Sequence, residues 1–200
     1  MRFGVTHREA ERILLEVQDI PADRHAAVRS RLRLLQRLGL AAGARQGQGK
    51  RAIYGARDLV VMALALEFSQ AGMAPERTLK LIQENDELIE RAISAAAVTK
   101  TTADSIFFVF DPVALRNDTV FFTYVDAAGF RKVYEEFAIQ RRLIRLSAIG
   151  LSALIDSIVD VLYPKVLFDV PGAGQLAANA AAFLRSLGSN GIRGVNDGDS

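Results

Sequence analysis

Hydrophobic positions recur at helical spacing through the first half of the chain, and turn-forming residues separate the runs. Thr6 and Glu9 have the spacing of a capping box, so a helix is predicted from residue 7 to about 17. Asp23 is expected to cap a second helix, which runs from 24 to about 38 and ends before a glycine.

The next segment has a different composition. Residues 41–51 contain three glycines and no periodic apolar residue, and residues 52–54 are β-like, which is typical of a flexible hairpin anchored by its second strand.

A strongly apolar third helix is predicted from 56 to 71. Pro75 suits the first turn of a fourth helix, which is expected to reach about residue 98, and residues 99–104 are interpreted as a joint.

After residue 104 the hydrophobic period becomes that of strands. The runs 105–110 and 119–125 are rich in β-branched and aromatic residues, so two paired strands are predicted. A long helix is expected from 130 to 163, a short one from 175 to 187, and a disordered tail beyond it. The expected organisation has three parts: 1–98, 104–165 and 166–200.

Half of the residues are hydrophobic, which is enough to bury a core, and the chain contains no cysteine. Disulfides, iron–sulfur clusters and zinc ribbons are thereby excluded, and no secretory signal is expected. The most apolar stretch, 143–163, is interrupted by Arg145, Asp156 and Asp160. Each such charge costs about 2.5–3.5 kcal/mol at the centre of a membrane. We therefore expect a cytoplasmic protein without a membrane segment.

The net charge of +2 says little, but the charges are segregated. Between Arg24 and Arg57 there are nine basic residues and no Asp or Glu. Such a cluster is the electrostatic footprint expected of a phosphate-binding surface. The alternative is a solvated basic face without a partner.

The predicted helix 24–38 has two different faces. The apolar face, expected to pack into the core, comprises Val28, Leu32, Leu35 and Leu38. The polar face comprises His25, Arg29, Ser30, Arg33, Gln36 and Arg37. Its three arginines are four residues apart and form a row. Arginine binds phosphate oxygens and guanine edges, and a helix of this width enters the major groove, so this face is a candidate DNA-reading surface.

Four landmarks over about residues 24–95 resemble the winged-helix domain of MerR-type regulators. They are the stretch 29–40 ending in Gly-Leu, the basic loop 45–51, the segment 54–59 (Tyr-Gly-Ala-Arg-Asp-Leu) and the turn 72–77 (Gly-Met-Ala-Pro-Glu-Arg). The resemblance implies an N-terminal winged helix–turn–helix, followed here by an α+β segment with a hairpin and a long helix. The family's metal-binding cysteines are absent, so metal sensing is not implied, and no cofactor is expected.

The candidate DNA-binding residues lie in the helix and in the loop that follows. Those of the helix are Arg24, His25, Arg29, Ser30, Arg33, Gln36 and Arg37. Those of the loop, which the resemblance makes a wing, are Arg45, Gln46, Gln48, Lys50 and Arg51, with Tyr54 bracing it.

The C-terminal half leaves two questions open. Apolar or small residues near heptad spacing let the expected helix 130–163 pair with a second copy or pack as a core helix on the strands. In MerR-like proteins the helix after the winged domain dimerises, which makes 75–98 the other candidate. The aromatic residues of the strands form either an effector pocket or, as we favour, a core beneath a helix. They are Phe107, Phe108, Phe110, Phe121, Phe122 and Tyr124.

No catalytic arrangement stands out. Neither of the two histidines lies in a pattern suited to nucleophilic catalysis, and Asp156 and Asp160 share a helix face without a further acid–base group. The prediction is a non-enzymatic, homodimeric bacterial transcription regulator that binds double-stranded DNA at the nucleoid, with a small-molecule or protein effector left open for its C-terminal half. The alternative is an interaction or chromosome-anchoring adaptor with generic or no DNA binding.

Overall fold

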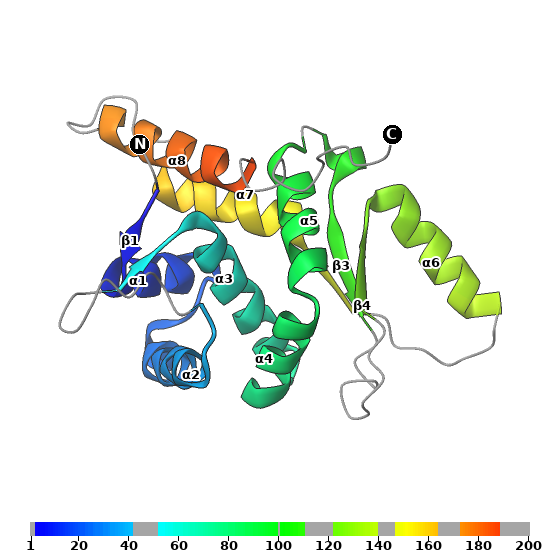
Figure 1. Ribbon diagram of the computed structural model, residues 1–200, viewed down its shortest axis with the longest axis horizontal. Helices are drawn as coiled ribbons and strands as arrows, with labels where there is room; N and C mark the ends of the chain where they lie inside the picture. The colour runs from blue at the N-terminus through cyan, green and yellow to red at the C-terminus, as the bar shows by residue number, and fades with distance from the viewer. Residues whose placement is uncertain are drawn as a thin grey trace, which may run out of the picture.

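The computed structural model describes residues 3–41, 52–99, 101–110, 122–139, 147–163 and 173–188. Helices dominate this part of the chain, and short strands form one two-stranded and one three-stranded sheet (Figure 1). The helices are α1 (His7–Val17), α2 (His25–Leu38), α3 (Ala56–Gln70), α4 (Pro75–Glu84), α5 (Asp86–Ala97), α6 (Ala127–Ile139), α7 (Leu151–Leu162) and α8 (Ala173–Gly188). The strands are β1 (Val5–Thr6), β2 (Ile53–Tyr54), β3 (Phe107–Phe110), β4 (Phe122–Val125) and β5 (Ser147–Gly150), and the short 3₁₀ turns are η1 (Ala22–Arg24) and η2 (Thr102–Asp104). A mainly helical fold with small β parts is confirmed.

Local sequence signals explain three of the helix ends. The Thr6 backbone N–H donates to the Glu9 carboxylate at 2.7 Å, and the Thr6 hydroxyl accepts from the Glu9 N–H at 3.4 Å, so the predicted capping box is present. Gly39 ends α2 with a φ of +109°, a conformation that favours glycine, and Pro75 occupies the first turn of α4. The predicted cap by Asp23 is wrong, because Asp23 lies inside η1 and α2 begins after Arg24 without a side-chain cap.

Helix α3 forms the centre of the molecule. It is apolar on every side, as expected of a helix surrounded by other elements, and it packs against α1, α4, α7 and α8. Phe68 of α3 is fully buried and contacts Phe110 and Phe122 of the three-stranded sheet, with ring centroids 5.3 and 5.9 Å apart. Phe3 meets Phe183 of α8 at 5.1 Å. The hydrophobic core therefore runs across the predicted boundary at 99–104.

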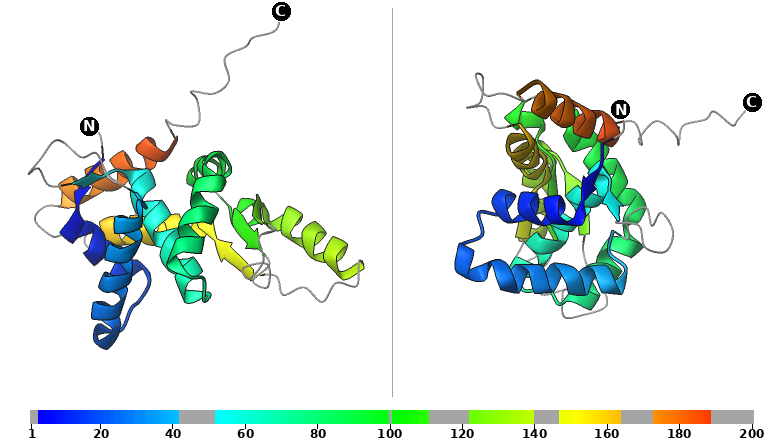
Figure 2. Two further views of the ribbon diagram at one scale, coloured as in Figure 1. Left: turned by 60° about the horizontal axis from the view of Figure 1, so that its bottom comes forward. Right: turned by 90° about the vertical axis from the view of Figure 1, so that its left-hand side faces the viewer.

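The three-stranded sheet has the order β4-β3-β5 and is antiparallel throughout. It lies between α5 and α6, and α7 follows directly from β5 (Figures 1 and 2). Phe108, Phe110 and Phe122 are buried in the main core, whereas Phe107 lies beside Phe130 of α6 at 6.0 Å. Phe108, Phe110 and Phe122 thus serve as core, the interpretation we favoured, whereas Phe107 and Tyr124 are half-buried and Phe121 lies outside the described residues.

The predicted long helix from 130 to 163 is wrong. The chain forms α6, then β5, then α7, and β5 pairs with β3 in a register that places Ser147 opposite Phe110 and Gly150 opposite Phe107. This pairing satisfies the second edge of β3 with a segment about 40 residues away, and a local periodicity cannot detect such a partner. The heptad seam proposed for this helix does not exist as a continuous surface.

The predicted helix 75–98 is also interrupted. Asn85 ends α4 and precedes α5, and its side-chain amide donates to the Leu81 carbonyl at 2.8 Å. An asparagine that binds a nearby backbone carbonyl competes with the helical pattern, which accounts for the break. Of the predicted hairpin loop 41–51, residues 42–51 lie outside the described residues, and the expected second strand, β2, pairs with β1.

Candidate nucleic-acid interface

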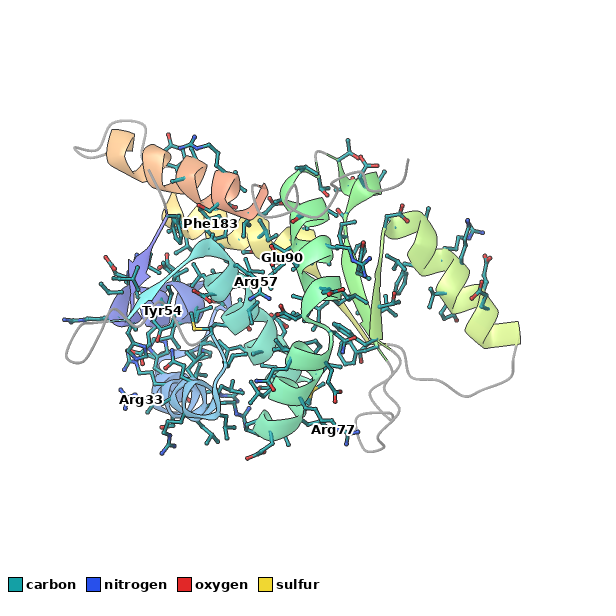
Figure 3. All side chains as sticks on the ribbon, in the orientation of Figure 1. Arg33, Tyr54, Arg57, Arg77, Glu90 and Phe183 are labelled. Atoms are coloured by element: carbon teal, nitrogen blue, oxygen red, sulfur yellow. The ribbon has the colours of Figure 1, made fainter. Side chains whose placement is uncertain are left out.

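Helix α2 presents its basic row on the exterior of the molecule. Leu32 and Leu35 are buried and fix the orientation of the helix, while Arg29 and Arg33 have side chains 46% and 63% exposed. Arg24, Ser30 and Arg37 are exposed as well. Figure 3 shows Arg33 on α2 at the margin of the molecule, away from the sheet and α6. Leu38, predicted to be in the core, is instead exposed, and Leu40 beyond the glycine is buried in its place.

Two of the predicted contact residues belong to an interior polar network. The Gln36 amide donates to the Tyr54 hydroxyl at 3.1 Å and lies 3.4 Å from Nδ1 of His7. Tyr54 is buried in β2 (Figure 3). Gln36 and Tyr54 therefore join α2 to β2 and α1, and their role is to hold α2 in place. His25 is half-buried, with Nε2 2.8 Å from the Ile20 carbonyl oxygen.

An acidic residue on α1 sits beside the basic row. The Glu11 side chain is only 13% exposed, and its carboxylate oxygens lie 3.9 Å from Nε of Arg29 and 4.0 Å from Nη2 of Arg33. His7 Nε2 is 3.4 Å from the same carboxylate. The basic segment contains no acidic residue, so sequence reasoning missed this partner. No local pattern indicates it, because Glu11 lies on α1 and meets the arginines only through the packing of α1 against α2.

A groove of about 950 Å³ runs between α1 and α2. Arg29 and Arg33 line one side, and Arg8, Arg12, Glu11 and Glu16 contribute to the other. The lining mixes both signs of charge, so the groove is not a dedicated anion pocket. The exposed arginines at its rim remain accessible to a ligand that approaches α2 from outside.

The two ends of the predicted wing are anchored in the core. Leu40 and Tyr54 are both buried on either side of it. The candidate residues of the wing itself, Arg45, Gln46, Gln48, Lys50 and Arg51, lie outside the described residues.

Arg57, counted with the basic segment, has a different environment. Its guanidinium donates to Glu90 at 2.5 Å and to Asp86, both on α5 (Figure 3). Burial disfavours the charge of Arg57, but the hydrogen bonds and charges of these two carboxylates outweigh burial and raise its pKa above the ordinary value. Arg57 thus links α3 to α5 and does not extend the exposed basic row.

Compared with protein-family models, curated proteins and solved structures, the chain gives no match. Among the helices that the structure describes, none is both long and apolar enough to cross a membrane. Within the same residues, no three His, Asp or Glu side chains gather as a metal site would require.

Proposed function

We propose that the protein is a sequence-specific, DNA-binding transcription regulator that acts as a homodimer, with α2 as its recognition helix. The observation that carries the proposal is the row of Arg29, Arg33 and Arg37 on the exposed side of a helix whose opposite side is buried. Exposed guanidinium groups one turn apart suit the phosphates and base edges of a major groove.

The arrangement around α2 supports this function. Helix α1 packs beside α2, as the first helix of a helix–turn–helix does, and β1 pairs with β2 at the point where the predicted wing returns to the core. Buried Leu35, together with the Gln36–Tyr54 hydrogen bond, anchors α2 to the body, and a base-reading helix needs such anchoring because its side chains must meet fixed positions on the duplex. The basic loop 45–51 would supply contacts to the backbone or minor groove.

Fluorescence anisotropy tests the proposal. The purified protein is titrated with a duplex that spans its own promoter and with a shuffled duplex of equal composition. A regulator binds the promoter about a thousandfold more tightly than the shuffled sequence. Replacing Arg33 by alanine should weaken promoter binding by about 1–3 kcal/mol if that side chain reads a base edge. If the Arg33→Ala protein binds the promoter as wild type does, the assignment of α2 is wrong.

Equal binding to both duplexes would favour the alternative function, a chromosome-anchoring adaptor with generic DNA contacts. Steep salt dependence on both duplexes is expected in that case, because the contacts are then to phosphates alone.

A further inference from the structure

Helix α6 carries an apolar stripe that its own chain covers only in part among the described side chains. Phe130, Val133 and Tyr134 have the i, i+3, i+4 spacing of one apolar stripe. None of the three is buried, and Tyr134 is 61% exposed, one of the most exposed large hydrophobic residues in the described part of the chain. By contrast, α4 buries all three residues that have this spacing, Thr78, Leu81 and Ile82.

The position of α6 explains this exposure. It packs on η2, β3 and β4, where Phe130 meets Phe107, and it projects from the body along the side of the sheet opposite α5 (Figures 1 and 2). Phe130 thus meets the sheet, whereas Tyr134, one turn further along the helix, is left for another surface to cover.

The charges of α6 indicate which surface that is. Arg131 and Lys132 lie in its first half, and Glu135 and Glu136 in its second, and all four are exposed. Within one helix, Arg131 pairs with Glu135 at 3.0 Å, but both side chains remain largely in solvent, at 83% and 55% exposure. When two copies of such a helix run antiparallel, the basic half of each lies opposite the acidic half of the other. A parallel arrangement would place like charges together.

We propose that α6 is a dimerisation surface, on which a second copy of this chain docks its own α6 in antiparallel orientation about a two-fold axis near Val133 and Tyr134. The apolar stripes meet at the centre, Arg131 and Glu136 border each stripe on its two sides, and Lys132 and Glu135 lie farther round the helix. A two-fold interface uses the same patch on both copies, and the charge order of α6 is self-complementary in this sense.

The contact is modest in size. A helix of 13 residues is about 20 Å long, and a standard interface buries about 800 Å² per partner, more than two such helices alone provide. We therefore expect a dimer dissociation constant on the order of 10–100 μM without DNA, and tighter pairing when both copies occupy one duplex.

This inference rests on the proposed function, because it supplies the contact of the proposed homodimer. Dimerisation is measured without DNA, so the dimer contact and the DNA-binding function can each fail while the other holds. Helices α6 and α2 lie toward opposite ends of the longest axis (Figure 1). A dimer joined through α6 thus holds the two α2 helices far apart, which suits half-sites separated by more than one turn of DNA.

Charge reversal on α6 provides the direct test. The mass of the protein is measured by light scattering or sedimentation at about 100–200 μM, a concentration at or above the expected dissociation constant. The weight-average mass of wild type should lie at about 1.5–1.9 times the 21.8 kDa of one chain. The variant Arg131→Glu/Lys132→Glu has an all-acidic α6, and Glu135→Lys/Glu136→Lys an all-basic one. Each alone should dissociate at least tenfold more readily than wild type, whereas an equimolar mixture should recover dimers, because the two altered helices complement each other.

The control is Lys80→Glu with Glu84→Lys, which exchanges an exposed i,i+4 pair on α4 and should leave the mass unchanged. A wild-type protein that stays monomeric overturns the proposal, as do charge-reversed variants that self-associate like wild type or fail to dimerise when mixed.

A second variant guards against misfolding of the charge-reversed chains. The chain has no cysteine, so Tyr134→Cys introduces a single thiol close to the proposed axis. Mild oxidation should cross-link Tyr134→Cys into a dimer, while Gln83→Cys, at an exposed position on α4, should not cross-link. Equal cross-linking of both variants, or none in Tyr134→Cys, contradicts the proposed contact.

Discussion

The carboxylate of Glu11 should restrain DNA binding, and its neutralisation offers a quantitative check on the role of α2. It lies 3.9 and 4.0 Å from the nearest guanidinium nitrogens of Arg29 and Arg33. A phosphate that binds these arginines must compete with Glu11 and is repelled by it. Glu11→Gln keeps the shape of the side chain and removes the charge, so it should tighten binding to DNA.

The exposure of each partner sets the size of the effect. Two unit charges 4 Å apart interact by about 1 kcal/mol in water and about 4 kcal/mol at an effective dielectric constant of 20. Glu11 is nearly buried, but Arg33 is 63% exposed, so the lower figure applies, and exposed pairs contribute about 0.2–1 kcal/mol. Two such pairs amount to about 1 kcal/mol, which corresponds to roughly 3–10-fold tighter binding of a random duplex at low salt.

Anisotropy with a random 20-base-pair duplex measures this change at roughly 50 and 200 mM salt, where screening should reduce the gain. Glu16→Gln is the matched control, because Glu16 lies on the same helix but pairs with Arg12 at 3.1 Å and not with α2. If Glu11→Gln binds no more tightly than wild type, the proposed competition is refuted. If Glu16→Gln gives the same gain, the effect reflects net charge alone.

Three further predictions concern stability. Leu35 is fully buried, so Leu35→Ala should lower the free energy of unfolding by about 2–5 kcal/mol in urea titrations, and a loss below about 1 kcal/mol would contradict its place in the core. Hydrogen bonds from the backbone and hydroxyl of Thr6 lower the pKa of Glu9 below its ordinary value of 4.5. The ionised Glu9 carboxylate therefore stabilises the fold above pH 4.5, and this stabilisation is lost as the pH falls through the lowered pKa of the folded protein. Glu9→Gln should remove this part of the pH dependence of the unfolding free energy. Arg57→Ala should cost about 1–3 kcal/mol of stability, because it leaves Glu90 without its partner, yet it should not change the salt dependence of DNA binding.

The N-terminal half was largely predictable because its signals are local. The capping box at Thr6, the positive φ at Gly39 and Pro75 in a first turn each depend on a few adjacent residues. The exposed position of Arg33 also followed from the helical period, since a buried Leu32 and Leu35 turn it outward.

The remaining differences arise from contacts between distant residues. Strand β5 forms because β3 has a free edge, and the interruption at Asn85 places Asp86 and Glu90 beside Arg57. Glu11 meets the basic row only after α1 packs on α2. A helical period read along the chain contains none of these pairings, so a long helix was predicted where a strand divides two short ones.

The most direct test of the central claim is the salt dependence of DNA affinity for wild type and for Arg29→Ala/Arg33→Ala/Arg37→Ala. Alanine is a good helix former and the three positions are exposed, so the variant should fold. Each lost phosphate contact lowers the slope of log K against log salt by about 0.9. We predict a slope smaller by about 2–3 in the triple variant, and an unchanged slope in Arg91→Ala, at an exposed position on α5. A wild-type protein that does not bind DNA, or a triple variant with the wild-type slope, would contradict the account.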